Sequence, residues 1–444
     1  MIYFNNAHQV IQESIKRLKS INQDEMFAHR NMLINYYQHQ NTKQYISDYF
    51  GGTLQREIPL YTTSLTKKII NRISMVYKDA PIRKYNNEVS EDINDLFYRK
   101  DYQMKSIERI HNLVGTMLIQ EVWNEQKMMV EYRPIIEYEV ALNPNDPKEV
   151  MAIIYPMIKT VDSKTQSQED MFVYWSNDQH YLINADGYKV SINEGDVNPY
   201  GVMPFVTIQP NNIVDEYFNT GEGEDIAIAN QQIDISMTML QHHIRCAGGQ
   251  MWVQGRADAD KIALGLNKIP VLEDGILGVL PNQSSIESIM TAIEHQIKHV
   301  LSNHHIAFDF GISTQKSGVA IKLENLELLE AREDDVEKYR QVEKDLYNIE
   351  KILVATHLGK NLPDDFSIDY AEIDFPDPQQ EMQQWDWWIK HGIKDKVDYI
   401  MEKDPDKFES REDVMKYLEE RQDVRNQRSN IFSLRRPEEN VDTI

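Results

Sequence analysis

Apolar residues recur at helical spacing through the first 110 residues of the chain. The spacing predicts helices over 10–18, 26–37, about 64–80 and 105–114. Thr62 or Thr63 is the expected N-cap of the third helix, and Pro81 ends it because proline disfavours helix in the preceding residue. Gly115 is expected to end the fourth helix. This part of the chain is therefore predicted to be mainly helical.

The pattern changes to a period of two between about Met117 and Pro210. Runs rich in β-branched and aromatic residues predict strands within 117–123, 128–134, 150–158, 171–176 and 180–187. NPNDP at 143–147 and NPYG at 198–201 are expected turns. The chain is thus predicted to contain an antiparallel, β-rich insert within a helical protein, which places it in the α+β class.

Helical spacing returns in the second half of the chain. Helices are predicted over 224–247 and 286–305, and the Gly-punctuated segment between them reads as β structure with a hairpin turn at Asp274-Gly275. A one-sided apolar stripe over 319–358 predicts a helix of about 40 residues, roughly 60 Å long. Its other face is charged, and we interpret it as a core helix with one solvated face. Beyond it, the sequence predicts a linker-like segment starting at Pro363 and then two or three short helices.

Composition narrows the classes of protein. The 444 residues include 71 Asp and Glu against 47 Lys and Arg, so the net charge is −24. A protein that binds nucleic acid over its whole surface would be basic, because Lys and Arg neutralise the phosphates. The single cysteine cannot form an intrachain disulfide, and no apolar run is long enough to span a bilayer. No signal peptide is expected. The chain is predicted to be a soluble intracellular protein, or part of an assembly made inside a cell.

The sequence predicts no catalytic residue, cofactor site or metal site. His295 and His299 have the i, i+4 spacing of two metal ligands, but the glutamate of a zinc-protease motif is missing between them. We interpret them as surface or interface histidines, with a metal-dependent nuclease or hydrolase as an alternative. GEGE at 221–224 lacks the remaining residues of a dinucleotide-binding or phosphate loop, and it is interpreted as the flexible start of a helix.

The order of segments resembles the portal proteins of tailed bacteriophages, which are head-to-tail connectors. The similar segments are TKKIINRISMVYKDAPIRKY at 66–85, IERIHNLVGTMLIQEVW at 107–123, NPYGVMPFVTIQPNN at 198–212, KSGVAIKLENLELLEAREDDVEKY at 316–339 and GIKDKVDYIMEKDPDKFESREDVMKYLEERQDV at 392–424. Each motif is loose, and their specificity lies in their number, order and spacing. The chain departs from the family pattern in having Asp79-Ala80-Pro81 where glycine is commoner, and in a short C-terminal crown region.

The resemblance implies an elongated, mainly helical subunit made of a wing, stem, clip and crown. The implied parts are a wing at 1–223, stem helices at 224–247 and 286–305, a clip at 248–285, a tunnel loop at 306–318, a long wing helix at 319–360, a wing and crown region at 361–430 and a flexible tail at 431–444. A portal is a homo-oligomeric ring, commonly of twelve subunits, at a capsid vertex. Double-stranded DNA passes through it during packaging and ejection. The implied partners are the terminase, the major capsid and scaffold proteins and the head-tail adaptors, with no membrane and with the host cytoplasm as the site of assembly.

The resemblance also suggests which residues face DNA or partners. In the tunnel loop these are Ser313, Thr314, Gln315 and Lys316, and on the second stem helix Lys298. In the clip, Arg256, Lys261 and Lys268 are candidate contacts to the adaptor or motor. For each lysine and arginine, ordinary solvated surface is the alternative. Another virion or capsid-associated structural protein is the alternative function.

Overall fold

The computed structural model divides the chain into two compact units. Residues 1–309 and 325–372 form the first unit, and 310–324 with 373–444 form the second. The structure describes residues 2–3, 7–19, 25–51, 60–157, 171–190, 192, 194–210, 216–245, 250–255, 275–280, 286–306, 325–373, 378–403, 411–418 and 421. Helices and strands are both abundant and the sheets are largely antiparallel, so the predicted α+β class is confirmed.

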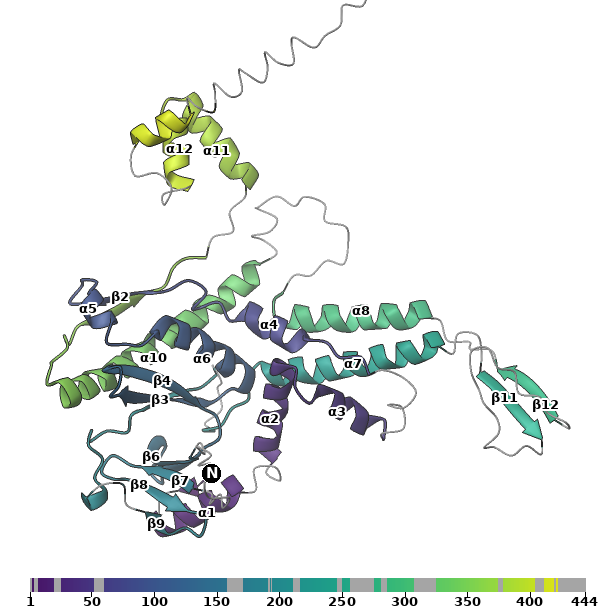
Figure 1. The fold of residues 1–444 in the computed structure, drawn as a ribbon, viewed down its shortest axis with the longest axis horizontal. Coiled ribbons are helices and arrows are strands. Elements are labelled where there is room, and N and C mark those ends of the chain that lie inside the picture. Colours follow the sequence, from purple (N-terminus) through teal and green to yellow (C-terminus); the bar gives the residue numbers. More distant parts are fainter. Residues whose placement is uncertain are drawn as a thin grey trace, which may run out of the picture. The chain divides into compact units, whose positions relative to one another are not determined.

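The chain is mainly helical up to Val114, as predicted for the first 110 residues (Figure 1). The helices of this part are α1 (Ala7–Lys19), α2 (Glu25–Gln38), α3 (Thr42–Tyr49), α4 (Leu65–Ile73), α5 (Glu91–Asn94) and α6 (Lys100–Val114). The predicted third helix was too long, because α4 already ends at Ile73. Gly115 follows α6 with φ 79°, a conformation that suits glycine, and this confirms the predicted helix end.

The largest sheet has the strand order β1-β5-β6-β7-β8-β9. Its strands are β1 (Ile2–Tyr3), β5 (Glu139–Asn143), β6 (Asp146–Pro156), β7 (Met171–Trp175), β8 (His180–Asn184) and β9 (Lys189–Val190). A 3-10 turn follows at Glu194–Asp196. The antiparallel prediction holds except at one edge, where β1 pairs parallel to β5 with Ile2 opposite Ala141. Helix α1 packs on this sheet through the predicted stripe that begins at Val10.

Two smaller sheets complete the core of the first unit. The order β10-β3-β4 joins β3 (Met117–Asn124), β4 (Met129–Ile135) and β10 (Phe205–Ile208). Strand β2 (Ile82–Tyr85) pairs with β13 (Phe366–Asp369), so part of the predicted linker is a strand. Helix α10 (Leu326–Leu358) packs against β3, β10 and β13. It has 33 residues, and the first part of the predicted 40-residue helix, 319–324, lies outside the described residues.

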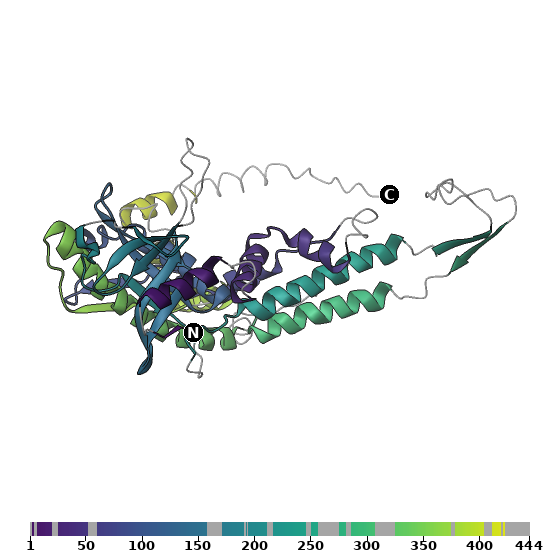
Figure 2. The ribbon, with the colours of Figure 1, turned by 90° about the horizontal axis from the view of Figure 1, so that it is seen from below.

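Helices α7 (Gly223–Arg245) and α8 (Ile286–Asn303) lie side by side, as Figures 1 and 2 show. Both agree closely with the predicted helices, and Ile233, Leu240 and Ile293 are buried between them. Between the helices in sequence, β11 (Gln250–Gly255) pairs antiparallel with β12 (Gly275–Leu280). Gly275 is the first residue of β12 and lies opposite Gly255. The residues preceding it in the predicted Asp274-Gly275 turn lie outside the described residues.

The second unit contains short helices, as predicted. They are α11 (Pro378–Lys390), α12 (Lys396–Lys403) and a helical segment at 411–418. Trp385 is buried and makes edge-to-face contacts with Trp388 and Tyr399, with ring centroids 5.1 and 5.0 Å away. Trp385 and Trp388 therefore serve helix packing, whereas Trp387 is exposed. The predicted tail at 431–444 lies outside the described residues.

Candidate functional site: the α7–α8 pair and its anchors

The structure describes one of the candidate contact residues, Lys298, which is exposed on α8. The tunnel-loop candidates Ser313, Thr314, Gln315 and Lys316 lie outside the described residues, as do the clip candidates Arg256, Lys261 and Lys268. The contact roles assigned to these eight residues therefore stay predictions. What the structure does describe is the helix pair that includes Lys298, and the contacts that hold the pair on the first unit.

Lys298 lines an open groove of about 740 Å³ along the helix pair. His295 and His299 line it too, together with the polar side chains Gln232, Gln296, Ser302 and Asn303. Both histidines are exposed on α8. Within the described part of the chain, no cluster of three or more His, Cys, Asp or Glu side chains could hold a metal ion. Ile228, Ala229 and Val300 line it as well, and Asp225 stands at it opposite in charge to Lys298. The groove is therefore of mixed apolar and polar character.

A ladder of hydrogen bonds attaches the segment before α4 to one face of α7. Asn230, Asp234 and Thr238 stand at i, i+4 and i+8 and are fully buried. The Thr63 backbone N–H and hydroxyl both donate to Asp234 Oδ1 at 2.8 Å. Tyr61 N–H donates to Thr238 Oγ1 at 3.1 Å. Because every rung joins different parts of the chain, the ladder fixes where α7 leaves the body of the unit.

The N-terminus of α4 is capped from outside the helix. The Thr66 N–H and hydroxyl donate to Asn230 Oδ1 at 2.9 and 3.0 Å, whereas Ser64, the N-cap residue, makes no side-chain capping bond. The expected cap by Thr62 or Thr63 is therefore wrong, because Thr63 is engaged with Asp234 and α7 supplies the acceptor. Burial raises the pKa of Asp234 to about 7, although the bonds from Thr63 and Asn230 oppose this shift.

The start of α7 also lies in backbone contact with the end of α6. A Cβ on Gly115 would stand 2.1 Å from the Asn219 carbonyl oxygen, and one on Gly223 would stand 2.2 Å from the Leu113 carbonyl oxygen. A Cβ on Gly221 would stand 2.5 Å from the Gly115 nitrogen. The GEGE motif does lead into α7, as predicted, and its glycines permit the close packing of two chain segments there.

His304 joins the C-terminal end of α8 to the N-terminal end of α7. It follows α8 directly and is buried, with Nδ1 3.1 Å from Glu222 Oε2 and Nε2 3.0 Å from Asp225 Oδ2. Burial alone would lower the pKa of His304, but the hydrogen bonds and charges of Asp225 and Glu222 raise it to about 9. Sequence reasoning did not find this contact, since nothing in the local pattern places residues 222 and 304 together.

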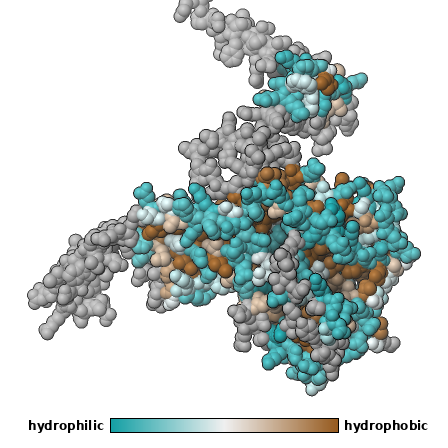
Figure 3. Space-filling model, turned by 180° about the vertical axis from the view of Figure 1, so that it is seen from behind, coloured by the Kyte–Doolittle hydropathy of each residue, from teal (hydrophilic) through white to brown (hydrophobic). Residues whose placement is uncertain are grey.

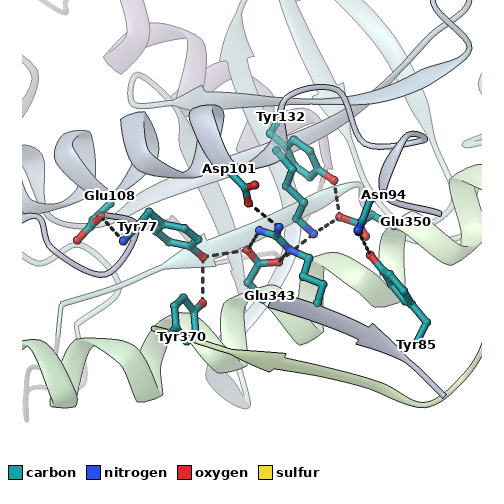
Figure 4. A network of polar contacts seen from close by, with 11 residues as sticks. Tyr77, Tyr85, Asn94, Asp101, Glu108, Tyr132, Glu343, Glu350 and Tyr370 are labelled. Atoms are coloured by element: carbon teal, nitrogen blue, oxygen red, sulfur yellow. Dashed lines mark hydrogen bonds and ion pairs between the residues drawn. The ribbon is translucent and has the colours of Figure 1, made fainter. Parts of the chain in front are cut away.

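A buried ionic network holds α10 against the strands and α6 (Figure 4). Lys100 Nζ lies 2.9 Å from Glu343 Oε2 and 2.5 Å from Glu350 Oε1, and Arg83 binds Glu343 with two nitrogens. Burial would raise the pKa of Glu343, but Arg83 and Lys100 lower it to about 2. Glu343 and Glu350 were expected on a solvated face of the long helix. That prediction was wrong, because both are fully buried against cations from β2 and α6.

Two further buried carboxyl groups lie beside this network. Glu108 accepts hydrogen bonds from the backbone of Val76 and Tyr77 at 2.8 and 3.1 Å, and burial raises its pKa to about 7 despite these bonds. Burial and the neighbouring Glu350 raise the pKa of Glu121 well above its usual value, and neither of its oxygens accepts a hydrogen bond from the described residues. Glu108 therefore joins the segment after α4 to α6, whereas Glu121 is buried without such a bond.

The helix pair also exposes apolar side chains. Ile228, Met239 and Ile244 of α7 and Met290 of α8 are between 39% and 48% exposed. Figure 3 shows the face opposite to that of Figure 1, on which apolar patches lie among hydrophilic residues. Singly exposed apolar residues are ordinary on a protein surface, whereas a contiguous apolar patch is typical of a surface that another protein covers. None of the described helices has the length and apolar composition needed to cross a membrane.

No protein-family model and no curated protein matches the sequence. Among solved structures, the chain is similar to one from the virion of a native gene transfer agent particle, at 12% identity over 80% of this chain and 89% of that chain, with a TM-score of 0.37. A chain from the neck of an empty particle, computed with C6 symmetry, has 12% identity, 77% and 89% coverage and a TM-score of 0.40. A chain from the neck of a native particle, computed with C12 symmetry, has 10% identity over 75% of this chain and 88% of that chain, with a TM-score of 0.37.

Proposed function

We propose that the chain is a portal subunit, which forms a closed ring at a capsid vertex and lets double-stranded DNA pass during packaging and ejection. One arrangement carries the proposal. An α+β body contains the anchored helix pair α7–α8, a β ribbon lies between the two helices in sequence, and the long helix α10 returns to pack on the body. The sequence segments that resemble portal proteins follow this same order along the chain.

In this proposal the helix pair is the stem, β11 and β12 belong to the clip, and α10 is the long wing helix. Lys298 of the stem and residues Ser313 to Lys316 of the tunnel loop contact DNA transiently. Arg256, Lys261 and Lys268 contact the terminase during packaging and the head-tail adaptors afterwards. The body contacts the major capsid and scaffold proteins, and assembly takes place in the host cytoplasm.

The exposed apolar side chains of α7 and α8 support a ring. A closed ring has heterologous interfaces, in which each subunit presents two different complementary faces to its neighbours. Apolar side chains such as Met239 and Met290 would be covered by the adjoining copy. The predicted ring has twelve subunits.

The net charge of −24 supports conduction of DNA over tight binding. Each phosphate neutralised by a protein cation adds salt-dependent affinity, so a basic channel would hold the duplex in place. An acidic wall repels the duplex, and a few lysines per ring provide brief contacts. The subunit then has no catalytic role, and the motor that moves DNA is a separate protein.

Electron microscopy of the purified full-length protein tests the proposal. The expected top view is a closed ring, with a central hole wide enough for a DNA duplex. Particles without a ring would overturn the proposal and favour another capsid-associated structural protein. Stoichiometric metal that survives dialysis, and is lost in a His295→Ala/His299→Ala variant, would favour the nuclease or hydrolase alternative instead.

A further inference from the structure

His304 makes two charge-assisted contacts with its imidazole ring. Nδ1 lies 3.1 Å from Glu222 Oε2, and Nε2 lies 3.1 and 3.0 Å from the two oxygens of Asp225. Carboxylate oxygens are acceptors, so both ring nitrogens must bear a proton for both contacts to be hydrogen bonds. Only the imidazolium form has two N–H groups. The geometry therefore requires a positively charged His304.

The three residues come from the N-terminal end of α7 and the C-terminal end of α8, which meet at one end of the helix pair. Glu222 immediately precedes α7, Asp225 stands in its first turn, and His304 follows Asn303, the last residue of α8. The imidazole is 4% exposed, while the carboxylates are 62% and 54% exposed. The contact thus closes the base of the pair, where the chain enters α7 and leaves α8.

We propose that His304 is a positioning residue that locks the base of the α7–α8 pair through this clamp, and that the clamp opens when the imidazolium loses its proton. A neutral ring keeps one N–H, so one carboxylate would face a nitrogen lone pair instead of a donor. The base of the helix pair would then lose one of the two hydrogen bonds that His304 donates. The clamp lies within one subunit, so it requires neither the assembly of a portal ring nor the presence of DNA.

Other charged groups face the clamp but have partners of their own. Next to it, His305 Nδ1 lies 3.1 Å from Glu327 Oε2. A cavity of about 290 Å³ beside His304 is also lined by Arg332, Asp335 and Lys338 of α10 and by His111 of α6. Lys338 binds Asp335 at 2.7 Å, and Arg332 donates to the carbonyl oxygens of Met75 and Ala371. Burial lowers the pKa of His111 to about 3, so that ring stays neutral.

The direction of the pH effect follows from the pKa of each partner. The pKa of His304 is raised from 6.5 to about 9, so its contribution to stability is complete below about pH 6.5 and is lost as the pH rises through about 9. The hydrogen bond to His304 lowers the pKa of Glu222, and the pKa of Asp225 is lowered as well. Their contributions are lost only as the pH falls through the acidic range. The clamp is therefore closed at neutral pH and opens on the alkaline side.

Thermal unfolding of the full-length protein between about pH 6.5 and about pH 10.5 tests the proposal, since the difference between variants follows the charge. The comparison uses wild type, His304→Gln and the matched control His299→Gln, an exposed histidine of the same helix. Near pH 7, His304→Gln should lower the unfolding midpoint by about 2–4 °C, and the difference should vanish near pH 10.5. His299→Gln should match wild type throughout. A His304→Gln deficit that is the same at both ends of the range would overturn the proposal.

Hydrogen exchange near pH 7 then locates the effect. His304→Gln should lose about tenfold protection in the first turn of α7 and the last turn of α8, with no change in α10. If His304→Gln does not fold, Glu222→Gln and Asp225→Asn, at exposed positions, remove the carboxylate charges that face His304. Each should give part of the same local loss. Unchanged protection at the base of the pair in these variants would also overturn the proposal.

Discussion

Arg83 and Glu343 form a two-point ion pair inside the first unit. Arg83 Nη2 lies 2.7 Å from Glu343 Oε1, and Arg83 Nε lies 3.1 Å from Glu343 Oε2. The arginine comes from β2 and the glutamate from the middle of α10. Parallel donors on a guanidinium fit a carboxylate in one orientation, so the pair fixes the rotation of α10 about its axis as well as its position.

Replacing Glu343 with alanine should lower the free energy of unfolding by about 3–5 kcal/mol, because Arg83 and Lys100 would remain buried without their main counter-charge. Urea unfolding of the purified chain measures the change. The matched control is Asp369→Ala, which removes the exposed ion pair with Lys84 and should cost no more than about 1 kcal/mol. Equal decreases in the free energy of unfolding of the two variants would show that the buried ion pair stabilises the protein no more than the exposed one.

Glu121→Gln should make the protein more tolerant of alkaline pH. Burial raises the pKa of Glu121 well above its usual value, so the native state holds a neutral carboxyl group. Its contribution to stability is largest below the unfolded pKa and is lost as the pH rises through the folded pKa. The variant should therefore show a smaller fall of its unfolding midpoint on going from acidic to alkaline pH.

The control for Glu121 is Glu131→Gln. The hydrogen bond from Lys127 lowers the pKa of Glu131, so the contribution of this residue is lost as the pH falls. The two substitutions should change the pH profile in opposite directions. If both profiles equal that of wild type, the assigned protonation states are incorrect.

Asn230→Ala should destabilise the protein by about 1–3 kcal/mol, because the Thr66 N–H and the Thr63 hydroxyl would lose a buried partner. The α4 N-terminus would also lose its cap. Denaturant unfolding measures the loss, and hydrogen exchange should place it at the start of α4. Gln232→Ala, at an exposed position on the same helix, is the control and should have little effect; a comparable loss there would contradict the capping role.

Gly115→Ala should impair folding far more than Gly359→Ala. Both glycines follow a helix with positive φ, at 79° and 63°, so both substitutions are strained. Only Gly115 has backbone atoms within 2.1 Å of the added Cβ, whereas Gly359 has open space. We expect about 1 kcal/mol for Gly359→Ala and a several-fold larger loss for Gly115→Ala. The yield of soluble protein and its unfolding midpoint measure the contrast, and similar values would refute the close approach of α6 and α7.

Lys316→Ala should leave ring assembly intact and change DNA packaging, if the tunnel loop touches DNA as proposed. Removing one lysine per subunit weakens transient phosphate contacts without touching a described interface. The length and amount of DNA in particles assembled with the variant measure the effect. Lys360→Ala, an exposed lysine just after α10, is the control. Normal DNA packaging by the Lys316→Ala variant would contradict the proposed contact between Lys316 and DNA.

Apolar periodicity predicted the α7–α8 pair within a few residues, because one stripe on each helix is buried against the other. The same method missed β5, a short strand that begins with Glu139. That glutamate is buried, with Arg17 at 3.8 Å, so the strand has a charged residue where an apolar one is expected.

The anchors of the helix pair were harder to predict, since their meaning depends on distant partners. Asn230, Asp234 and Thr238 repeat every four residues among apolar neighbours, and this spacing was a usable signal of a polar ladder. His304 gave no such signal, because its partners are about 80 residues earlier in the chain. Glu343 and Glu350 resembled solvent-facing charges until β2 and α6 placed cations beside them.

The partners of β2 and α6 have a consequence for synthesis on the ribosome. Arg83 meets Glu343 at a separation of 260 residues, and Lys100 meets Glu350 at a separation of 250. Within the described residues, strand β2 pairs with β13, which begins at Phe366, in a two-stranded sheet. Arg83 also pairs with Asp101, which follows it closely in the chain, but both cations lack their buried glutamates and β2 lacks β13 while most of the chain is being translated. The core of the first unit can therefore close only late in translation, and the nascent chain depends on solvent or chaperones to cover it until then.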